Sequence, residues 1–205
     1  MQPSREGLLK HVARAAELLR AGELVVYPTE TFYALGALAS SPSALARLIA
    51  AKGRPEGKSL PLIAADLAQV ESVGFFEAPL ARRIASRLWP GPLTLVIPAR
   101  SGIAPELVAP DRTVAVRIPG SRVARSLALS AGGPLVSTSA NPSGEAPPSS
   151  AEAVSPKILA AVAEILDGGQ TPGGKPSTLV LIEDASFRVV REGAVSRSQI
   201  EEACR

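Results

Sequence analysis

Residues 25–36, VVYPTETFYALG, begin as an apolar strand and become polar directly after a proline. The two valines and the tyrosine suit a buried strand, because β-branched and aromatic side chains pack well on a pleated sheet. The threonine, glutamate and threonine of residues 29–31 follow without a helix-forming run around them. A strand therefore ends here in a turn rich in hydrogen-bonding groups, which a plain connecting turn does not require.

Apolar strands and helical segments alternate along most of the chain. The expected strands are ELVVYP (23–28), LPLIAA (60–65), LTLVIP (93–98), TVAVRIP (113–119), PLVSTS (134–139), TLVLIE (178–183) and FRVVRE (187–192). The expected helices are 5–20, 42–52, 78–88, 121–131, one ending at DGG (167–169) and one beginning at 196. This alternation predicts an α/β fold, and the short link between the last two strands favours a hairpin and thus a mixed sheet. Without a repeat or long linker, we expect a single domain over residues 1–205.

The composition excludes several classes of site. Cys204 and His11 are the only cysteine and histidine, which excludes a cysteine zinc cluster and disfavours a histidine metal site or a Ser-His-Asp triad. The 22 Lys and Arg residues exceed the 19 Asp and Glu residues by 3, too little to indicate a nucleic-acid-binding protein by charge alone. The sequence has no uninterrupted apolar run of about 18 residues, which argues against a membrane span. Without a signal peptide or disulfides, we expect a cytoplasmic protein that does not enter membranes.

Polar groups collect where the expected strands begin or end. They are found in YPTET (27–31), STSANPSG (137–144), GGKPST (173–178) and RVVREGA (188–194). Ligands of open α/β sheets bind beyond the strand ends, where loops and helix N-termini converge, so these stretches can share one crevice. The alternative for each stretch is an ordinary turn with satisfied hydroxyl groups. With no histidine to act as a base, the serines favour binding over nucleophilic attack.

The segment KGRPEGK (52–58) concentrates three cations, Lys52, Arg54 and Lys58. It follows a helix instead of preceding one, so it is not a phosphate-binding P-loop. Three cations on an irregular loop can still grip a polyphosphate, with arginine as a bidentate donor. The alternative is a solvated basic loop whose charges favour the helix C-terminus.

Seven motifs occur in the order of a known family. They are YPTETFYALG, KGRP, WPGPLTLVIP, VAVRIP, STSANPSG, PSTLV and REGA. Together they resemble the YrdC/Sua family of threonylcarbamoyl-AMP synthases over nearly the whole chain, in its short single-domain form. The resemblance implies an open twisted mixed sheet with flanking helices and a basic concave face. It also implies a nucleotidyltransferase that makes threonylcarbamoyl-AMP and pyrophosphate from L-threonine, bicarbonate or CO2, and ATP.

The resemblance assigns roles to individual residues. The family's K-x-R and S-x-N signature falls on the expected catalytic residues Lys52, Arg54, Ser139 and Asn141. Threonine would be bound by Thr31, Arg117, Ser137 and Ser177. ATP would be held by Arg54, Lys58, Thr113, Ser139 and Arg191. No metal ligand is expected from the protein, because Mg2+ would be bound through the ATP phosphates.

The resemblance also implies partners, and two alternatives remain beside it. The product would pass to the proteins that transfer the threonylcarbamoyl group to tRNA, and direct binding of tRNA or double-stranded RNA is left open. A non-catalytic RNA-binding module is one alternative, although 3% aromatic residues offer few stacking platforms for single strands. The other is a carbamoyl transferase domain of the kind found in hydrogenase-maturation proteins, which the short chain disfavours.

Overall fold

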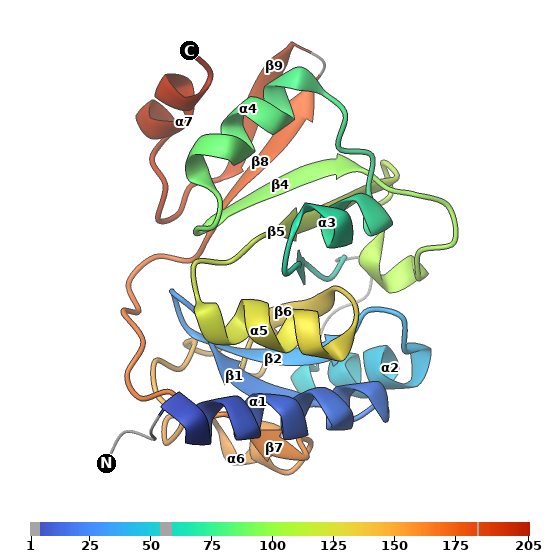
Figure 1. The fold of residues 1–205 in the computed structure, drawn as a ribbon, viewed down its shortest axis with the longest axis vertical. Helices are drawn as coiled ribbons and strands as arrows, with labels where there is room; N and C mark the ends of the chain where they lie inside the picture. Colours follow the sequence, from blue (N-terminus) through green and yellow to red (C-terminus); the bar gives the residue numbers. More distant parts are fainter. Residues whose placement is uncertain (1–4, 54–58, 184) are drawn as a thin grey trace.

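The computed structural model describes residues 5–53, 59–183 and 185–205. The helices are α1 (Arg5–Arg20), α2 (Pro42–Lys52), α3 (Leu67–Val73), α4 (Pro79–Leu88), the 3-10 helix η1 (Pro105–Leu107), α5 (Arg122–Ala131), α6 (Pro156–Leu159) and α7 (Arg197–Ala203). The strands are β1 (Val25–Pro28), β2 (Tyr33–Leu38), β3 (Leu62–Ile63), β4 (Leu93–Pro98), β5 (Thr113–Arg117), β6 (Leu135–Ser139), β7 (Glu164–Ile165), β8 (Thr178–Glu183) and β9 (Ser186–Arg191). Figure 1 shows their arrangement.

All of these strands join one mixed sheet in the order β7-β1-β2-β6-β3-β5-β4-β8-β9. β6 lies between β2 and β3 and is antiparallel to both, whereas β3 and β5 are parallel, as are β4 and β8. β8 and β9 form the expected antiparallel hairpin. The sequence-based expectation of an α/β fold with a mixed sheet and flanking helices is confirmed.

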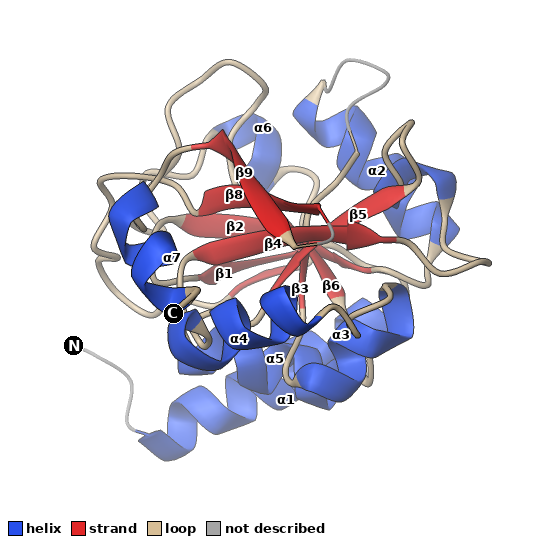
Figure 2. Ribbon diagram, turned by 90° about the horizontal axis from the view of Figure 1, so that it is seen from above, coloured by secondary structure: helices blue, strands red, loops and turns tan. Residues whose placement is uncertain are grey.

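Helices cover both faces of the sheet (Figure 2). α1 and α5 lie on one face, and α2 and α6 lie on the other. β1 shows why a strand of this sheet is apolar at successive positions. Val25 and Tyr27 pack with residues of α1 and α5, whereas Val26 belongs to the cluster that includes α2 and α6. Successive strand residues point to opposite faces, so a strand covered on both sides needs apolar residues at every position.

Three features of the fold differ from the expectation or were missed. The expected helix ending at DGG (167–169) is wrong. Only the short helix α6 is helical in this region, and the strand β7 lies between α6 and DGG. α3 was missed, although Asp66 caps it by accepting from the Gln69 amide. β2 was also missed, since its sequence YALGAL is poor in β-branched residues. It is a strand because β1 and β6 pair with it on either side.

Two glycines allow close approaches that position the strand ends. A Cβ on Gly36 in β2 would lie 2.5 Å from the Tyr27 ring, and a Cβ on Gly193 would lie 2.1 Å from the Pro176 carbonyl oxygen. The Gly193 amide donates to the buried Thr178 hydroxyl at 2.9 Å. The segment after β9 is therefore pressed against the start of β8. Within the described ranges, no helix combines the length and apolar character needed to cross a membrane.

Candidate active site

The polar strand ends converge on one cavity of about 660 Å³. Its wall combines hydroxyl groups, cations and apolar side chains from β2, β3, β4, β5, β6, β8, β9 and the turn after β1. The volume is in the range of small-molecule sites, and mixed walls with a few convergent polar groups are typical of such sites. The polar residues of the wall include Thr29, Thr31, Lys52, Ser59, Thr94, Arg117, Ser137, Thr138, Ser139, Asn141, Ser143, Ser177 and Arg191.

The turn after β1 is rigid because Thr29 satisfies its backbone. The Thr29 hydroxyl donates to the Phe32 carbonyl at 2.7 Å and accepts from the Thr31 and Phe32 amides at 3.2 and 3.3 Å. The Thr31 hydroxyl lies 3.1 Å from the Thr29 hydroxyl. The Thr31 carbonyl accepts from the Gly173 amide at 2.8 Å, which ties the turn to the loop before β8. Thr31 is thereby held at the cavity wall, 7% exposed.

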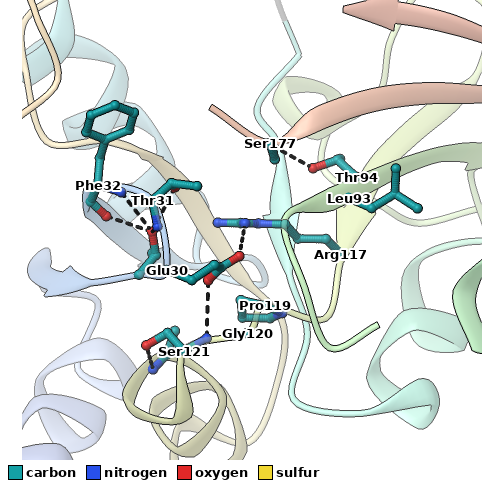
Figure 3. Close-up of polar contacts among 12 residues, drawn as sticks. Glu30, Thr31, Phe32, Leu93, Thr94, Arg117, Pro119, Gly120, Ser121 and Ser177 are labelled. Carbon is teal, nitrogen blue, oxygen red and sulfur yellow. Dashed lines mark hydrogen bonds and ion pairs between the residues drawn. The ribbon is translucent and has the colours of Figure 1, made fainter. Parts of the chain in front are cut away.

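Arg117, at the end of β5, forms a buried ion pair with Glu30 (Figure 3). The guanidinium Nη1 donates to Glu30 Oε1, and Glu30 Oε2 accepts from the Ser121 amide at 3.2 Å. The Arg117 side chain is 8% exposed and that of Glu30 is 17% exposed. Among the ion pairs of the described residues, only this one has both side chains less than one fifth exposed. Arg117 lines the cavity.

The end of β6 brings hydroxyl and amide groups to the same cavity. Ser137 and Ser139 are two positions apart and share one face of the strand, and both line the cavity. Asn141 Nδ2 donates to the Pro142 and Glu145 carbonyls at 2.9 and 2.6 Å. Within the described part of the chain, Asn141 Oδ1 is the buried side-chain polar atom that makes no hydrogen bond. It is an acceptor that a ligand can use.

Lys52 is buried at the end of α2, with 3% of its surface exposed. Its ammonium donates to the Ser139 carbonyl at 2.6 Å and to the Asn141 carbonyl at 2.7 Å. The interpretation of this residue as a solvated charge is therefore wrong, because its ammonium is buried and hydrogen-bonded to two backbone carbonyls. Arg54 and Lys58, the other two cations of the basic segment, lie outside the described residues.

A hydrogen-bonded group near Arg117 is formed by Thr94 of β4, Ser177 just before β8 and Arg191 of β9. The Thr94 hydroxyl of β4 donates to Ser177 Oγ at 3.0 Å (Figure 3). Arg191 Nη2 donates to the Ser177 carbonyl at 2.9 Å. Burial lowers the pKa of Arg191 below its usual value, and the nearby positive charge of Arg117 lowers it further. The two guanidinium groups thus repel each other across the cavity, and a bound anion would relieve that repulsion.

Tyr27 is buried in β1 with 0% of its surface exposed. Burial raises the pKa of its phenol, and a hydrogen bond with the Ser137 side chain opposes the rise. Since the phenol stays neutral, it can donate or accept beneath Ser137 without adding charge. The Tyr27 phenol donates to the Val136 carbonyl at 3.5 Å and so supports the segment that carries Ser137.

The structure brings most of the sequence-predicted residues together. Those that line the cavity are Lys52, Ser139, Asn141, Thr31, Arg117, Ser137, Ser177 and Arg191. Thr113 does not line it, because it lies at the opposite end of β5 from Arg117 and its hydroxyl donates to Asp111 at 2.6 Å. Sequence analysis missed Thr94, whose signal was a hydroxyl inside the otherwise apolar strand LTLVIP, and gave Glu30 no role of its own.

The cavity is suited to anions. Arg117, Arg191 and Lys52 supply positive charge to its wall, and no aspartate or glutamate belongs to the described lining. Within the described residues, no group of three or more His, Cys, Asp or Glu side chains could hold a metal ion. The donors are therefore suited to carboxylate and phosphate oxygens, which arginine and hydroxyl groups bind by directed hydrogen bonds.

Comparison with known proteins agrees with this geometry. The model of the Sua5/YciO/YrdC family, described as "Telomere recombination", matches residues 17–193. The threonylcarbamoyl-AMP synthase of Bacillus subtilis is 38% identical over 191 residues, which are 93% of this chain and 55% of that protein. The chain thus spans about half the length of that relative. The threonylcarbamoyl-AMP synthase of Thiobacillus denitrificans is 41% identical over 162 residues, 79% of this chain and 86% of that one.

A solved structure shares both the fold and part of the sequence. It is Pyrococcus abyssi Sua5 complexed with L-threonine, with a TM-score of 0.90 and 35% identity. The match covers 95% of this chain and 57% of that one. The similarity extends over nearly all of the sheet and its flanking helices.

Proposed function

The chain belongs to the Sua5/YciO/YrdC family, and on that basis we propose that it is a threonylcarbamoyl-AMP synthase. It would join L-threonine, bicarbonate or CO2, and ATP to give threonylcarbamoyl-AMP and pyrophosphate. The observation that carries this proposal is the buried guanidinium of Arg117 beside the hydroxyl groups of Thr31, Ser137 and Ser177 in one cavity. A cation and several neutral hydroxyls match an amino acid that has a carboxylate, an amine and a hydroxyl of its own.

In this proposal, Arg117 binds the threonine carboxylate, and the three hydroxyls bind the amine and the side-chain hydroxyl. The relative from Pyrococcus abyssi was solved with L-threonine, which supports threonine as the amino acid here. The apolar part of the lining, which includes Ala34 and Leu62, gives the γ-methyl group of threonine a dry surface to contact.

The nucleotide would occupy the part of the cavity nearest Arg191 and Ser139. Arg191 would hold phosphate oxygens, and Asn141 Oδ1 would accept a hydrogen bond from the nucleotide. Arg54 and Lys58 follow α2 directly in the sequence, and we assign them to the triphosphate. Mg2+ carried by the ATP phosphates would supply further charge neutralisation, as is usual for this hard cation.

The reaction needs no covalent intermediate with the protein. The threonine amine adds to CO2 and loses a proton, which gives a carbamate. A carbamate oxygen then attacks the α-phosphorus, and the bond from that phosphorus to the pyrophosphate leaving group breaks. Neither histidine nor cysteine lines the described cavity, so the contribution of the protein is to position the two substrates and to stabilise the charge on the phosphates.

We further propose that the product serves tRNA modification. Threonylcarbamoyl-AMP would be consumed by proteins that transfer the threonylcarbamoyl group to the adenosine beside the anticodon, in the cytoplasm. The alternative is an RNA-binding module of the same fold without catalysis, in which the cations contact phosphates of RNA.

One assay separates these possibilities. Pyrophosphate release from ATP is measured with all three substrates and with threonine or bicarbonate omitted in turn. The synthase requires both, and mass spectrometry should detect threonylcarbamoyl-AMP in the complete mixture. Absence of release in the complete mixture, together with salt-dependent RNA binding, would instead support the RNA-binding module.

A further inference from the structure

Glu30 has a function that its position in a substrate-binding turn does not reveal. It lies between Thr29 and Thr31, which both line the cavity, but Glu30 itself is not part of the lining. Its carboxylate instead contacts Arg117 and the Ser121 amide (Figure 3). The carboxylate therefore holds the guanidinium without itself forming part of the cavity wall.

Glu30 is held in place by the turn that carries it and by the Ser121 amide. The Thr29 hydroxyl fixes the turn that carries it. The Ser121 amide, just before the first residue of α5, fixes one carboxylate oxygen. Gly120 lies beside the side chain, and a Cβ there would meet Glu30 Cγ at an ordinary contact distance of 3.4 Å. The Glu30 carboxylate is thus held in a fixed position relative to β1 and α5.

Arg117 has no comparable anchor of its own. Within the described residues, the contact with Glu30 is the one hydrogen bond that its guanidinium makes. An arginine side chain has many rotamers and loses considerable entropy when it is ordered. The charge of Arg117 helps to lower the pKa of Arg191, so the two guanidinium groups are close enough to interact, and Arg191 would repel Arg117 if the carboxylate were absent.

We propose that Glu30 is a positioning residue that holds one edge of the Arg117 guanidinium and so aims the remaining N–H groups at the amino-acid carboxylate. This inference rests on the proposed function, because it assumes that threonine is the ligand of Arg117. Glu30 also neutralises the buried guanidinium before substrate arrives, so Arg117 remains in its binding position in the empty site.

The experiment compares steady-state kinetics of Glu30→Ala, Glu30→Gln, Arg117→Ala and the double variant Glu30→Ala/Arg117→Ala with those of the wild type. Glu30→Ala should raise the threonine KM at least about tenfold and change the ATP KM less than about twofold. Glu30→Gln should have a smaller effect, because its amide oxygen can still accept from Arg117 while its amide nitrogen cannot accept from Ser121. The double variant should resemble Arg117→Ala alone, since Glu30 acts through that residue.

Glu71→Ala is the matched control, because it removes a carboxylate that pairs with Arg82 at 3.1 Å on the surface. It should leave both KM values unchanged. Thermal unfolding of each variant checks the fold, and if Glu30→Ala does not fold, the isosteric Glu30→Gln decides the matter alone.

Three results overturn the inference: an unchanged threonine KM in the folded Glu30 variants, an equal rise in both KM values, or additive effects in the double variant. A wild-type protein without threonine-dependent release overturns the proposed function, and the inference with it. The two failures are therefore distinguished by the wild-type activity.

Discussion

Lys52 Nζ donates to the backbone oxygen of Ser139 at 2.6 Å, although 87 positions separate the two residues. The contact joins the end of α2 to the end of β6. Together with the bond to the Asn141 carbonyl, it satisfies backbone groups of the last residue of β6 and of the segment just beyond it. Lys52 is thus as important for the shape of the site as for its charge.

Replacing Lys52 by alanine should lower both stability and activity. Two carbonyls that accept from a buried ammonium would lose their donor, which predicts a loss of about 2–3 kcal/mol in the free energy of unfolding. Urea unfolding measures this, and Lys157→Ala, at an exposed lysine, is the control. Changes within about 0.5 kcal/mol for both variants would contradict a structural role.

Replacing Thr94 by valine should weaken threonine binding with little change in stability. Valine fills the same space in β4 but cannot donate to Ser177, so the Ser177 hydroxyl loses its fixed orientation. We expect the threonine KM to rise by roughly threefold to tenfold, in keeping with the loss of about 1 kcal/mol of hydrogen bonding. Ser72→Ala removes an exposed hydroxyl and should change nothing. An unaltered threonine KM in Thr94→Val would exclude Thr94 from the support of the site.

Valine should be a poor substitute for threonine as a substrate. The hydroxyl groups of Thr31, Ser137 and Ser177 would have no partner on the valine side chain, and buried polar groups without partners are costly. The threonine kcat/KM for pyrophosphate release should exceed that of valine by at least about 100-fold. Comparable values for the two amino acids would refute the assignment of these hydroxyls to the amino acid.

Gly193→Ala should be strongly destabilising. Its Cβ would lie 2.1 Å from the Pro176 carbonyl oxygen and 2.7 Å from the Ser177 carbonyl carbon, so the backbone must shift. Overpacking of this kind costs about 1–3 kcal/mol or more, and the shift would displace Ser177 from the cavity. Gly133→Ala is the matched control, because its Cβ would meet only Leu38 at an ordinary 3.6 Å. Equal melting temperatures for the two variants would contradict the close approach.

Alkaline titration of the folded protein should show almost no tyrosinate near pH 10, where free phenols are half ionised. The chain has two tyrosines, and burial is the main cause that raises the pKa of both, to about 12 for Tyr33. In the unfolded chain these phenols ionise near pH 10. Their contribution to stability is thus fully present below about pH 10 and is lost as the pH rises toward 12. Ultraviolet absorbance and circular dichroism, followed together, should change together, and Tyr33→Phe should reduce the pH dependence of unfolding.

The elements that periodicity defines were predicted well from the sequence. The helix 42–52 is one example, because Ser41 caps it and Gly53 ends it in the left-handed conformation, as expected. β2 was not predicted because its alanines and glycine have little preference for strands. These small residues are needed for packing, above all at Gly36, where the Tyr27 ring occupies the space of a Cβ. The segment before DGG was misassigned because its helical pattern is interrupted after one turn.

The sequence predicted which residues belong to the site but not the hydrogen bonds and ion pair that join them. The family resemblance identified Thr31, Ser137 and Arg117, all of which line the cavity. Nothing in the sequence indicated that Glu30 pairs with Arg117 or that Lys52 is buried. Those contacts join positions 87 residues apart in each case, and only the order of strands in the sheet brings such positions together.

The position of Ser137 and Ser139 on β6 also constrains how this protein can evolve. Their hydroxyls reach the cavity because they are separated by one intervening residue. Insertion or deletion of a single residue in β6 would turn the following side chains to the other face, and both neighbouring strands fix the register, so no slippage could restore them. We therefore expect a single-residue insertion or deletion in β6 to abolish the site, whereas the same change in an exposed turn such as 101–102 leaves it in place.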